Sequence, residues 1–436
     1  MLTKIKIENF KSIKKLDLEL APLTIFVGPN ASGKSNVLEA IAILAQTPKL
    51  PGNITRSLLG SLEYGEFVRY PSSRDFPLFD FIAHKKDWSN FITFEMHMGE
   101  WLLEDLILSD IGYSYAFMPR KEEVRQAVFE NEKKLVEVGY VSAGEKLWRR
   151  EFLYPEEFTQ IIQLTGNTEY ILDPTCVSYS LKPVQITDQK RQQLEKSALR
   201  AQEIVKKFEK AFKRIYFISA IRGEVRSMSE ILESEPSLGT HGEGLIEILS
   251  LIFRRPEFEN KAGKIVEWAS KFGMDELKAG WWSRRYLTAD YLDPEFQTRL
   301  NLTLASQGSR QILTVIAQLF WSDPGSVIMI EEPEMSLHIE SQLELPTMFA
   351  EAIKDDKQVI VTTHSEHLIL ALKPLIASGE LKPKDVAIWH FEKTAEGTKA
   401  ERLKLTDKGI VEGWIPSYVK AEGAIIKEWF DTLPED

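Results

Sequence analysis

The sequence predicts an α/β fold in which strand ends converge on a phosphate-binding loop. The loop is residues 28–35, GPNASGKS, which follows the apolar run Leu23–Val27 and precedes a helical pattern at residues 37–44. Two later apolar runs, residues 327–330 and 359–361, also end in polar clusters. Ligands of α/β sheets bind outside the carboxyl ends of the strands. We therefore expect these segments to form one site.

The loop has the composition that holds a nucleoside triphosphate. Its glycines let backbone N–H groups curl around phosphate oxygens, and the following helix adds its dipole. Lys34 supplies charge for the β- and γ-phosphates, and the Ser35 hydroxyl is placed to ligate Mg²⁺. A chance glycine-rich turn is disfavoured, because every fixed position is matched between a strand and a helix. The predicted nucleotide-binding residues are Gly28, Pro29, Asn30, Ala31, Ser32, Gly33, Lys34 and Ser35.

Composition indicates an ordinary globular protein. The chain has 436 residues, 43% hydrophobic and 27% charged, and this length favours two or three domains. One cysteine, Cys176, excludes a disulfide framework and a cysteine-based zinc site. We recognise no signal peptide and no apolar run near the roughly 20 residues of a membrane span, so we expect a cytoplasmic protein. A net charge of −11 means that any nucleic-acid contact needs a local basic face.

The first half of the chain is expected to be mainly strands, with one long helix. The helix after the loop is expected to end near Pro48, where irregular residues 48–80 begin. The expected strands are Leu2–Phe10, residues 13–20, residues 91–108, Lys146–Leu153 and Glu169–Leu172. Apolar residues spaced by three and four predict a helix from Asp188 to about Ile215. It is either a coiled-coil stub or, as we favour at this length, an amphipathic helix packed on a sheet.

The second half alternates helices and strands. The expected elements are a strand at Tyr216–Ser219, helices within residues 243–272, a hairpin at residues 281–304, a helix at Ile312–Phe320, a strand at Val386–Phe391 and a helix at Ala421–Phe430. The segment Trp281–Tyr286 interleaves aromatic residues with arginines. It suits either stacking with nucleic acid or a hairpin with one buried aromatic face, and alternation alone favours the hairpin.

Two carboxylates and a histidine complete the predicted site. Glu331 and Glu332 end an apolar strand, where the first can hold Mg²⁺ and the second can activate the attacking water. His364 ends the next apolar strand and can donate to a γ-phosphate, although a structural histidine is the alternative there. Ser306, Gln307 and Gly308 precede the Ile312 helix, whose N-terminus can bind an anion.

The ordered motifs GPNASGKS, SQGSRQ, VIMIEEPEMSLH and VIVTTHSEH resemble the ABC-type ATPase heads of the SMC, RecF and OLD-like group. The opening residues 5–13 resemble the strand pair that leads into the ATP loop of that group. The resemblance implies an ABC-type head with a mixed sheet, an antiparallel β lobe and an inserted α/β-helical subdomain. It implies domains at 1–110 (ATPase half with Walker A), 111–214 (insertion), 215–395 (second ATPase half) and 396–436 (tail).

The resemblance also implies roles for the motif residues. Residues 28–35 become the Walker A loop, Glu331 the Walker B acid and Glu332 the catalytic base. Residues 306–311 become the signature motif, residues 336–338 the D-loop and His364 the switch histidine. In this group the signature motif contacts ATP held by a second head, which implies an ATP- and Mg²⁺-dependent homodimer.

Several positions depart from the family pattern. Glu331 stands where Asp is usual, as in OLD-like members. No Gln lies between Gln46 and Gln126 to serve as the Q-loop residue, and Asp80 or His84 are candidates for its place. Gln307 stands where small residues are common. Arg222 resembles an arginine near the site of relatives, although a plain surface arginine is as consistent with the sequence.

The function expected is ATP binding and hydrolysis in DNA maintenance or phage defence, with DNA and a separate effector protein as candidate partners and none in a membrane. A regulatory nucleotide switch with slow ATPase and no DNA contact is the alternative. The insertion and the Glu331–Glu334 acid cluster disfavour a transporter subunit. The 72 residues after His364 contain no acid cluster suited to a two-metal nuclease.

Overall fold

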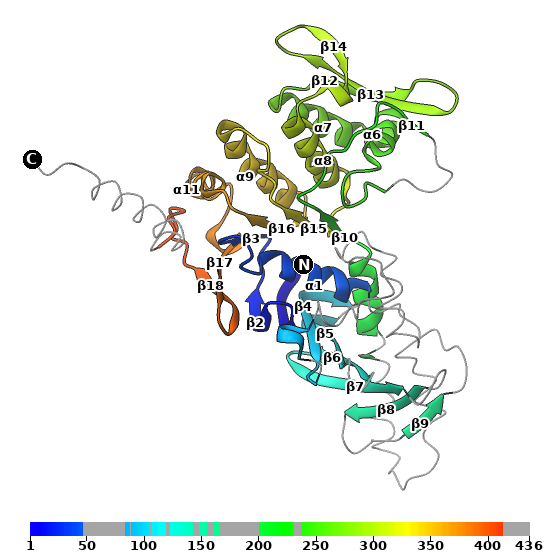
Figure 1. Cartoon of the computed structure of the whole chain (residues 1–436), viewed down its shortest axis with the longest axis vertical. Coiled ribbons are helices and arrows are strands. Elements are labelled where there is room, and N and C mark those ends of the chain that lie inside the picture. The colour runs from blue at the N-terminus through cyan, green and yellow to red at the C-terminus, as the bar shows by residue number, and fades with distance from the viewer. Residues whose placement is uncertain are drawn as a thin grey trace, which may run out of the picture. The chain divides into compact units, whose positions relative to one another are not determined.

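The computed structural model describes residues 1–46, 83–87, 89–103, 106–118, 123–142, 148–154, 161–164, 200–201, 203–230 and 237–412. The chain divides into two compact units (Figure 1). Unit 1 comprises residues 1–20, 35–215 and 394–398, and unit 2 comprises residues 21–34, 216–393 and 399–436. The predicted strand at Glu169–Leu172, helix at Ala421–Phe430 and irregular stretch at 48–80 lie outside the described residues.

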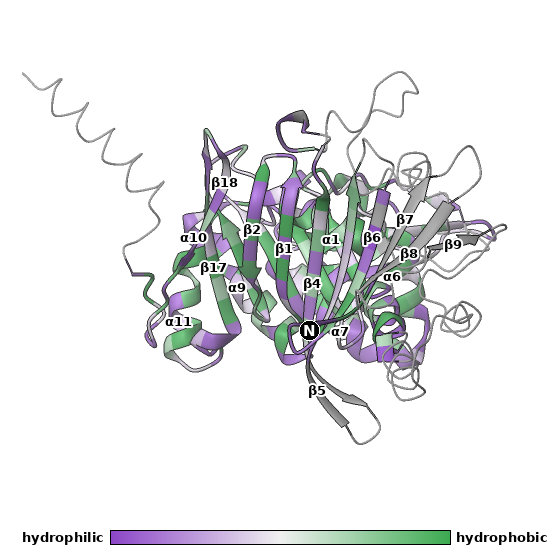
Figure 2. Cartoon of the chain, turned by 90° about the horizontal axis from the view of Figure 1, so that it is seen from below, coloured by the Kyte–Doolittle hydropathy of each residue, from purple (hydrophilic) through white to green (hydrophobic). Residues whose placement is uncertain are grey.

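Unit 1 is built on an eight-stranded sheet in the order β2-β1-β4-β5-β6-β7-β8-β9. Its paired strands are antiparallel. The strands are β1 Leu2–Phe10, β2 Ile13–Glu19, β4 Ile92–Leu103, β5 Leu106–Met118, β6 Glu123–Glu130, β7 Lys133–Ser142, β8 Trp148–Tyr154 and β9 Ile161–Leu164. Apolar and polar residues alternate along β1 and β2, as Figure 2 shows in green and purple. This alternation buries one face of each strand.

Two helical segments accompany this sheet. Helix α1 covers Lys34–Gln46 and η2 covers His84–Lys86. The long predicted helix is described at residues 200–201 and 203–212, where Phe208 and Phe212 are buried and their rings contact Tyr113 of β5. The packed amphipathic helix is therefore confirmed over this part. It ends at residue 212, earlier than predicted, because Ile215 begins strand β10.

A buried charged cluster lies on β1, β4 and β5 of unit 1. His97 donates from Nε2 to Glu95 Oε1 at 2.7 Å and from Nδ1 to Asp110 Oδ2 at 3.1 Å, and Lys6 also donates to Glu95. Burial alone would lower the pKa of His97, but the hydrogen bond and charges of Glu95 and Asp110 raise it. Burial would raise the pKa of Glu95, yet His97 and Lys6 hold that pKa at about 2.

This cluster makes folding stability depend on pH. A histidine whose pKa is raised by folding adds stability below its unfolded pKa and loses it as pH rises through the folded value. We therefore expect the urea midpoint to fall as pH rises above about 6.5. His97→Gln should remove that part of the fall, whereas His367→Gln on α10 should keep the wild-type slope. Equal slopes in all three proteins would contradict this account.

Unit 2 is built on a six-stranded sheet in the order β10-β15-β16-β3-β17-β18, with β3 between two strands from the far end of the chain (Figure 1). Strands β15, β16, β3 and β17 are parallel. The short connection from β17 to β18 requires an antiparallel pair, so the sheet is mixed. The strands are β3 Leu23–Val27, β10 Ile215–Ile218, β15 Val327–Glu331, β16 Gln358–Thr363, β17 Val386–Thr394 and β18 Gly397–Leu403.

Helices and a small sheet complete unit 2. The helices are α6 Leu245–Arg254, η5 Pro256–Phe258, α7 Glu259–Lys271, η6 Leu302–Leu304, α8 Gln307–Trp321, α9 Ile339–Lys354, α10 Glu366–Leu370, α11 Leu372–Ala377 and η7 Pro383–Asp385. The small sheet contains β11 Ser229–Glu230, β12 Asp275–Trp281, β13 Tyr286–Asp293 and β14 Thr298–Asn301. A large core of Leu, Ile, Val and Phe side chains unites these elements.

The predicted fold class is confirmed. The α/β class with a mixed sheet and an antiparallel lobe is present. The hairpin predicted over residues 281–304 is confirmed within narrower bounds, as β13 paired with β14, and strand β12 before it was not predicted. The alternation through Trp282 and Arg284 falls in the β12–β13 turn rather than in a strand. The division at residues 110, 214 and 395 stays a prediction.

Candidate nucleotide site

The central sheet of unit 2 brings the predicted site residues to one edge. Because β3, β15 and β16 are parallel, their carboxyl ends face the same way. The register pairs Val27 with Thr363. Gly28, Glu332 and His364 each follow directly after one of these strands, so the sheet places all three at its carboxyl edge, where α/β proteins bind ligands.

The phosphate loop runs from β3 into α1, as predicted. Gly28 has a φ of +151°, and a Cβ there would lie 2.3 Å from the Phe391 carbonyl oxygen, so only glycine fits. Lys34 is buried, and its Nζ donates to the carbonyls of Gly28 at 2.8 Å and Pro29 at 2.9 Å. Residues 30–33 complete the loop, and Ser35 follows Lys34 in the first turn of α1. The N-terminus of α1 thus begins at the loop.

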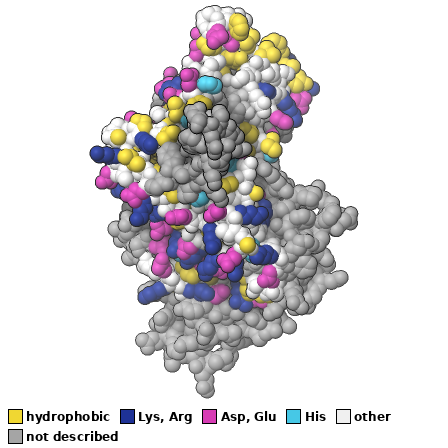
Figure 3. Space-filling model, turned by 60° about the vertical axis from the view of Figure 1, so that its left-hand side comes forward, with side chains coloured by type: hydrophobic (Ala, Val, Ile, Leu, Met, Phe, Trp, Pro, Cys, Tyr) yellow, Lys and Arg dark blue, Asp and Glu magenta, His cyan; other side chains and the backbone are white. Residues whose placement is uncertain are grey.

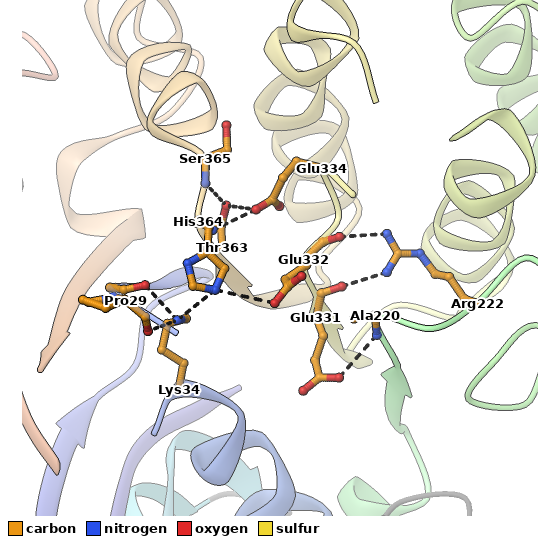
Figure 4. A network of polar contacts seen from close by, with 11 residues as sticks. Pro29, Lys34, Ala220, Arg222, Glu331, Glu332, Glu334, Thr363, His364 and Ser365 are labelled. Carbon is orange, nitrogen blue, oxygen red and sulfur yellow. Dashed lines mark hydrogen bonds and ion pairs between the residues drawn. The ribbon is translucent and has the colours of Figure 1, made fainter. Parts of the chain in front are cut away.

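Lys34, His364 and Glu332 form one polar chain (Figure 4). His364 Nε2 lies 3.2 Å from Lys34 Nζ and 3.6 Å from Glu332 Oε1. Burial lowers the pKa of Lys34 to about 8, against the opposing charges of Glu332 and Glu334. Burial and the Lys34 charge lower the pKa of His364, against Glu332. His364 is therefore neutral near pH 7, and its Nε2 can accept from Lys34.

The two successive glutamates at the end of β15 point to different partners. Glu331 is buried, and its Oε2 accepts from the Ala220 backbone N–H at 3.3 Å. Glu332 has a φ of +43°, a left-handed conformation that costs energy for a residue with a Cβ. Its N–H still donates to the Thr362 carbonyl at 2.8 Å. This backbone bend separates the two carboxylates and directs Glu332 toward His364.

Arg222 holds that bend in place. Its Nη1 donates to the carbonyls of Ser219 and Glu331, its Nη2 to those of Glu332 and Pro333, and its Nε to that of Gln311, at 2.7–3.2 Å. These bonds use all five N–H groups of the guanidinium. The side chain is 3% exposed, so a plain surface arginine was the wrong alternative. Burial lowers its pKa to about 10, against the charges of Glu334, Glu331 and Glu332.

Replacing Arg222 should destabilise unit 2 strongly. Arg222→Met would remove the guanidinium donor from five carbonyl oxygens, of which that of Glu332 keeps the Met335 N–H at 3.0 Å. Each buried group that is left without a partner costs about 1–3 kcal/mol. We expect a loss of at least about 3 kcal/mol by urea unfolding. Arg226→Met, at an exposed position four residues on, is the matched control and should change stability by less than about 0.5 kcal/mol. Similar midpoints for both variants would show that the clamp is dispensable.

Glu334 is a site residue that the sequence reading did not single out. Its Oε1 accepts from the Thr363 hydroxyl at 2.7 Å and from the His364 backbone N–H at 2.8 Å. Burial raises the pKa of Glu334 despite these bonds. Glu334 therefore ties the end of β15 to the end of β16 and orients His364. The available signal was the third acid in the run Glu331-Glu332-Pro333-Glu334.

The predicted signature residues begin helix α8. The Ser306 hydroxyl caps the helix by accepting from the Ser309 N–H at 3.0 Å. Ser306 and Gln307 are exposed, whereas Gly308 is buried. A Cβ at Gly308 would lie 2.3 Å from the Ser336 carbonyl oxygen, so glycine lets the signature turn approach the predicted D-loop. Within the described residues, the Ser306 hydroxyl bonds Ser309 and no residue of the phosphate loop.

Asp80 and His84 are the residues suggested for the place of the missing Q-loop glutamine. Asp80 lies outside the described residues. His84 belongs to unit 1, where its Nδ1 lies 2.9 Å from the Lys11 carbonyl oxygen. Within the described ranges, no group of three or more His, Cys, Asp or Glu side chains is arranged to hold a metal ion.

A family model described as "AAA ATPase domain" matches residues 1–140 and 177–369, well over half of the chain. The chain belongs to this family. The chain is also 43% identical over 60 residues to the DNA replication and repair protein RecF of Lactobacillus acidophilus, and the match covers 14% of this chain and 16% of that protein. It is 32% identical over 74 residues to the OLD nuclease of Thermus scotoductus, covering 17% and 13% respectively. The resemblance to the SMC, RecF and OLD-like group is confirmed.

The matched segments are short: the chain aligns with less than a fifth of the length of either relative. A solved structure described as the SmcHead bound to the C-winged helix domain of ScpA has a TM-score of 0.47 at 12% identity, covering 93% of this chain and 98% of that one. That likeness is too distant to carry functional meaning. None of the helices in the described part of the chain combines the length and hydropathy that a membrane span requires.

Proposed function

We propose that this chain binds ATP with Mg²⁺ and hydrolyses it to ADP and phosphate. The observation that carries the proposal is the polar chain from Lys34 through His364 to Glu332, with 3.2 and 3.6 Å between the successive groups. A phosphate-binding cation, a histidine and a carboxylate at one strand edge are the groups that phosphoryl transfer to water uses. Family membership and the RecF- and OLD-like segments support the same conclusion.

In the proposed reaction, the oxygen of a water molecule attacks the γ-phosphorus, and the Glu332 carboxylate accepts a proton from that water. The bond from the γ-phosphorus to the bridging oxygen breaks, and ADP leaves with the electron pair. Lys34 neutralises charge on the β- and γ-phosphates, and His364 donates to the γ-phosphate. Arg222 keeps Glu332 in its bent conformation. The hydroxyl of Ser35 and the carboxylate of Glu331 suit Mg²⁺, which prefers oxygen ligands and usually takes only one or two carboxylates beside phosphates.

We propose further that two heads close on ATP. Ser306 and Gln307 are exposed at the N-terminus of α8, where backbone N–H groups can bind an anion. Within the described residues, the Ser306 hydroxyl bonds Ser309 rather than the phosphate loop of its own chain. A second copy could bring its γ-phosphate to that helix. ATP binding would then favour the dimer, and hydrolysis would release it. We infer a role in DNA maintenance or phage defence through a partner effector, as suggested by the RecF and OLD relatives.

Turnover and assembly measured together test this proposal. ATP hydrolysis is followed with and without DNA, and light scattering reports the mass with ATP and Mg²⁺. We expect hydrolysis, and a doubling of mass that needs ATP. Stimulation by DNA supports the DNA-linked role, whereas slow, DNA-independent turnover supports the alternative, a regulatory switch without DNA contact. A protein that binds no ATP would overturn both.

A further inference from the structure

The β12–β13 turn of the small sheet carries an exposed aromatic and basic surface that the ATP site does not use. We name residues Trp281–Tyr286 the tryptophan–arginine turn. Trp281 is 53% exposed and Trp282 is 70% exposed, so the predicted buried aromatic face is wrong. Hydrophobic side chains, drawn in yellow, gather over the small sheet in Figure 3. Exposed tryptophans of this size are uncommon on a surface without a partner.

The tryptophan–arginine turn is ordered by its own hydrogen bonds. The N–H groups of Trp282 and Ser283 both donate to the Tyr286 carbonyl, at 2.9 and 3.2 Å. The Arg254 guanidinium lies 4.9 Å from the centroid of the Trp281 ring, and its Nε also donates to the Ser250 carbonyl. These contacts hold one face of Trp281 on α6. The aromatic groups are therefore pre-arranged, which lowers the entropy cost of binding.

The tryptophan–arginine turn carries two positive charges that solvent and ligands can reach. Arg284 and Arg285 are exposed, and in the described part of the chain their guanidinium groups have no ion pair or hydrogen bond. No acid lies within the turn, and within the described residues its contact with a carboxylate is that of the Tyr286 hydroxyl, which donates to Glu230 Oε1 at 3.4 Å. On a chain of net charge −11, this is the local basic face that a polyanion requires.

We propose that the tryptophan–arginine turn binds single-stranded nucleic acid, with bases stacked on Trp281 and Trp282 and phosphates paired with Arg284 and Arg285. Stacking needs bases that are free of a duplex, and it tolerates any sequence because every base has a π-face. The two arginines lie between Trp282 and Tyr286, so cationic groups alternate with aromatic rings, the combination that single-stranded nucleic acid requires. This inference gives a ligand class to the DNA-linked role proposed above, but it requires no ATP hydrolysis.

The test is fluorescence anisotropy with labelled oligothymidylate, oligouridylate and a duplex of equal length. We expect both single strands to bind more tightly than the duplex, and their ratio distinguishes DNA from RNA. Trp282→Ala should weaken binding about 5- to 150-fold, the range for losing one stacked base. Replacing both Arg284 and Arg285 by Ala should reduce the dependence of log K on log salt by about 0.7 per lost phosphate contact.

Phe296→Ala is the matched control. Phe296 is 76% exposed on the same sheet, but it lies in the β13–β14 turn beside Asp293 and Glu295. Its removal should leave affinity unchanged. Equal losses in Trp282→Ala and Phe296→Ala, or no binding of either single strand at low salt, would overturn the proposal, as would a turn that captures a protein partner instead. Lys34→Ala should bind the oligonucleotides like wild type, which separates this surface from failure of the ATP site.

Discussion

Replacing Glu332 by glutamine is expected to stop ATP turnover while the protein still binds ATP. The amide has nearly the shape of the carboxylate, so the bend held by Arg222 is retained. It cannot accept the proton of the attacking water, however, and loss of a general base costs about 100-fold to 10,000-fold in rate. We expect turnover at least about 100-fold slower and a dimer that persists with ATP and Mg²⁺.

Phosphate release and light scattering measure these two outcomes. Glu340→Gln makes the same chemical change at an exposed position on α9, and it should leave both turnover and mass unaltered. If the Glu332→Gln protein hydrolyses ATP at the wild-type rate, Glu332 is not the base. If it binds ATP but stays monomeric, the two-head model is wrong even though the base is correctly assigned.

Replacing Lys34 by alanine is expected to remove most of the affinity for ATP. The Lys34 ammonium is buried, and within the described residues its hydrogen-bond partners are the carbonyls of Gly28 and Pro29 and the ring of His364. Phosphates would replace these neutral partners with charged ones, and hydrogen bonds between charged groups contribute about 1.5–3 kcal/mol each. Loss of one such bond weakens binding about 10- to 150-fold.

Isothermal titration with ATP and Mg²⁺ measures this change. Lys278→Ala removes a lysine from an exposed position on β12 and should bind ATP like wild type. Because burial lowers the pKa of Lys34 to about 8, the free ammonium loses its proton as pH rises through that value. Affinity should therefore decline above pH 8 in the wild type. Undiminished affinity in Lys34→Ala would exclude the role given to the loop.

The surface charges do not obscure these measurements. Acidic and basic side chains lie interspersed over the face seen in Figure 3, and their surface pairs contribute little to stability. Single substitutions at Glu340 or Lys278 should accordingly leave the fold unchanged. The controls make the same chemical changes at exposed positions outside the nucleotide site.

The sequence predicted the parts of the site that follow strands. An apolar run ending in Glu331-Glu332 and another ending before His364 are local patterns, and parallel pairing brings their ends together. Arg222 was harder to interpret, because its partners are backbone carbonyls from three separate segments. Carbonyl groups are present at every residue, so such bonds leave no pattern in the sequence.

The burial of the aromatic side chains in the small sheet was predicted wrongly, for a different reason. Trp282, Arg284 and Tyr286 alternate like a strand, and alternation usually means one buried face. In the structure this alternation falls in a turn closed by the Tyr286 carbonyl, so all three side chains are exposed. Strand β12 lies just before it. Periodicity alone cannot distinguish a strand from an ordered turn that is only a few residues long.

The central position of β3 has a consequence for how the protein is made. Its partner β17 begins roughly 360 residues later in the chain, and its other partner, β16, is nearly as distant. At ribosomal rates of about 5–20 residues per second, β3 waits about 20 to 70 s for both neighbours to emerge. Its four buried apolar residues are exposed during that time, so the nascent chain should require chaperone protection before the ATP loop can assume its shape.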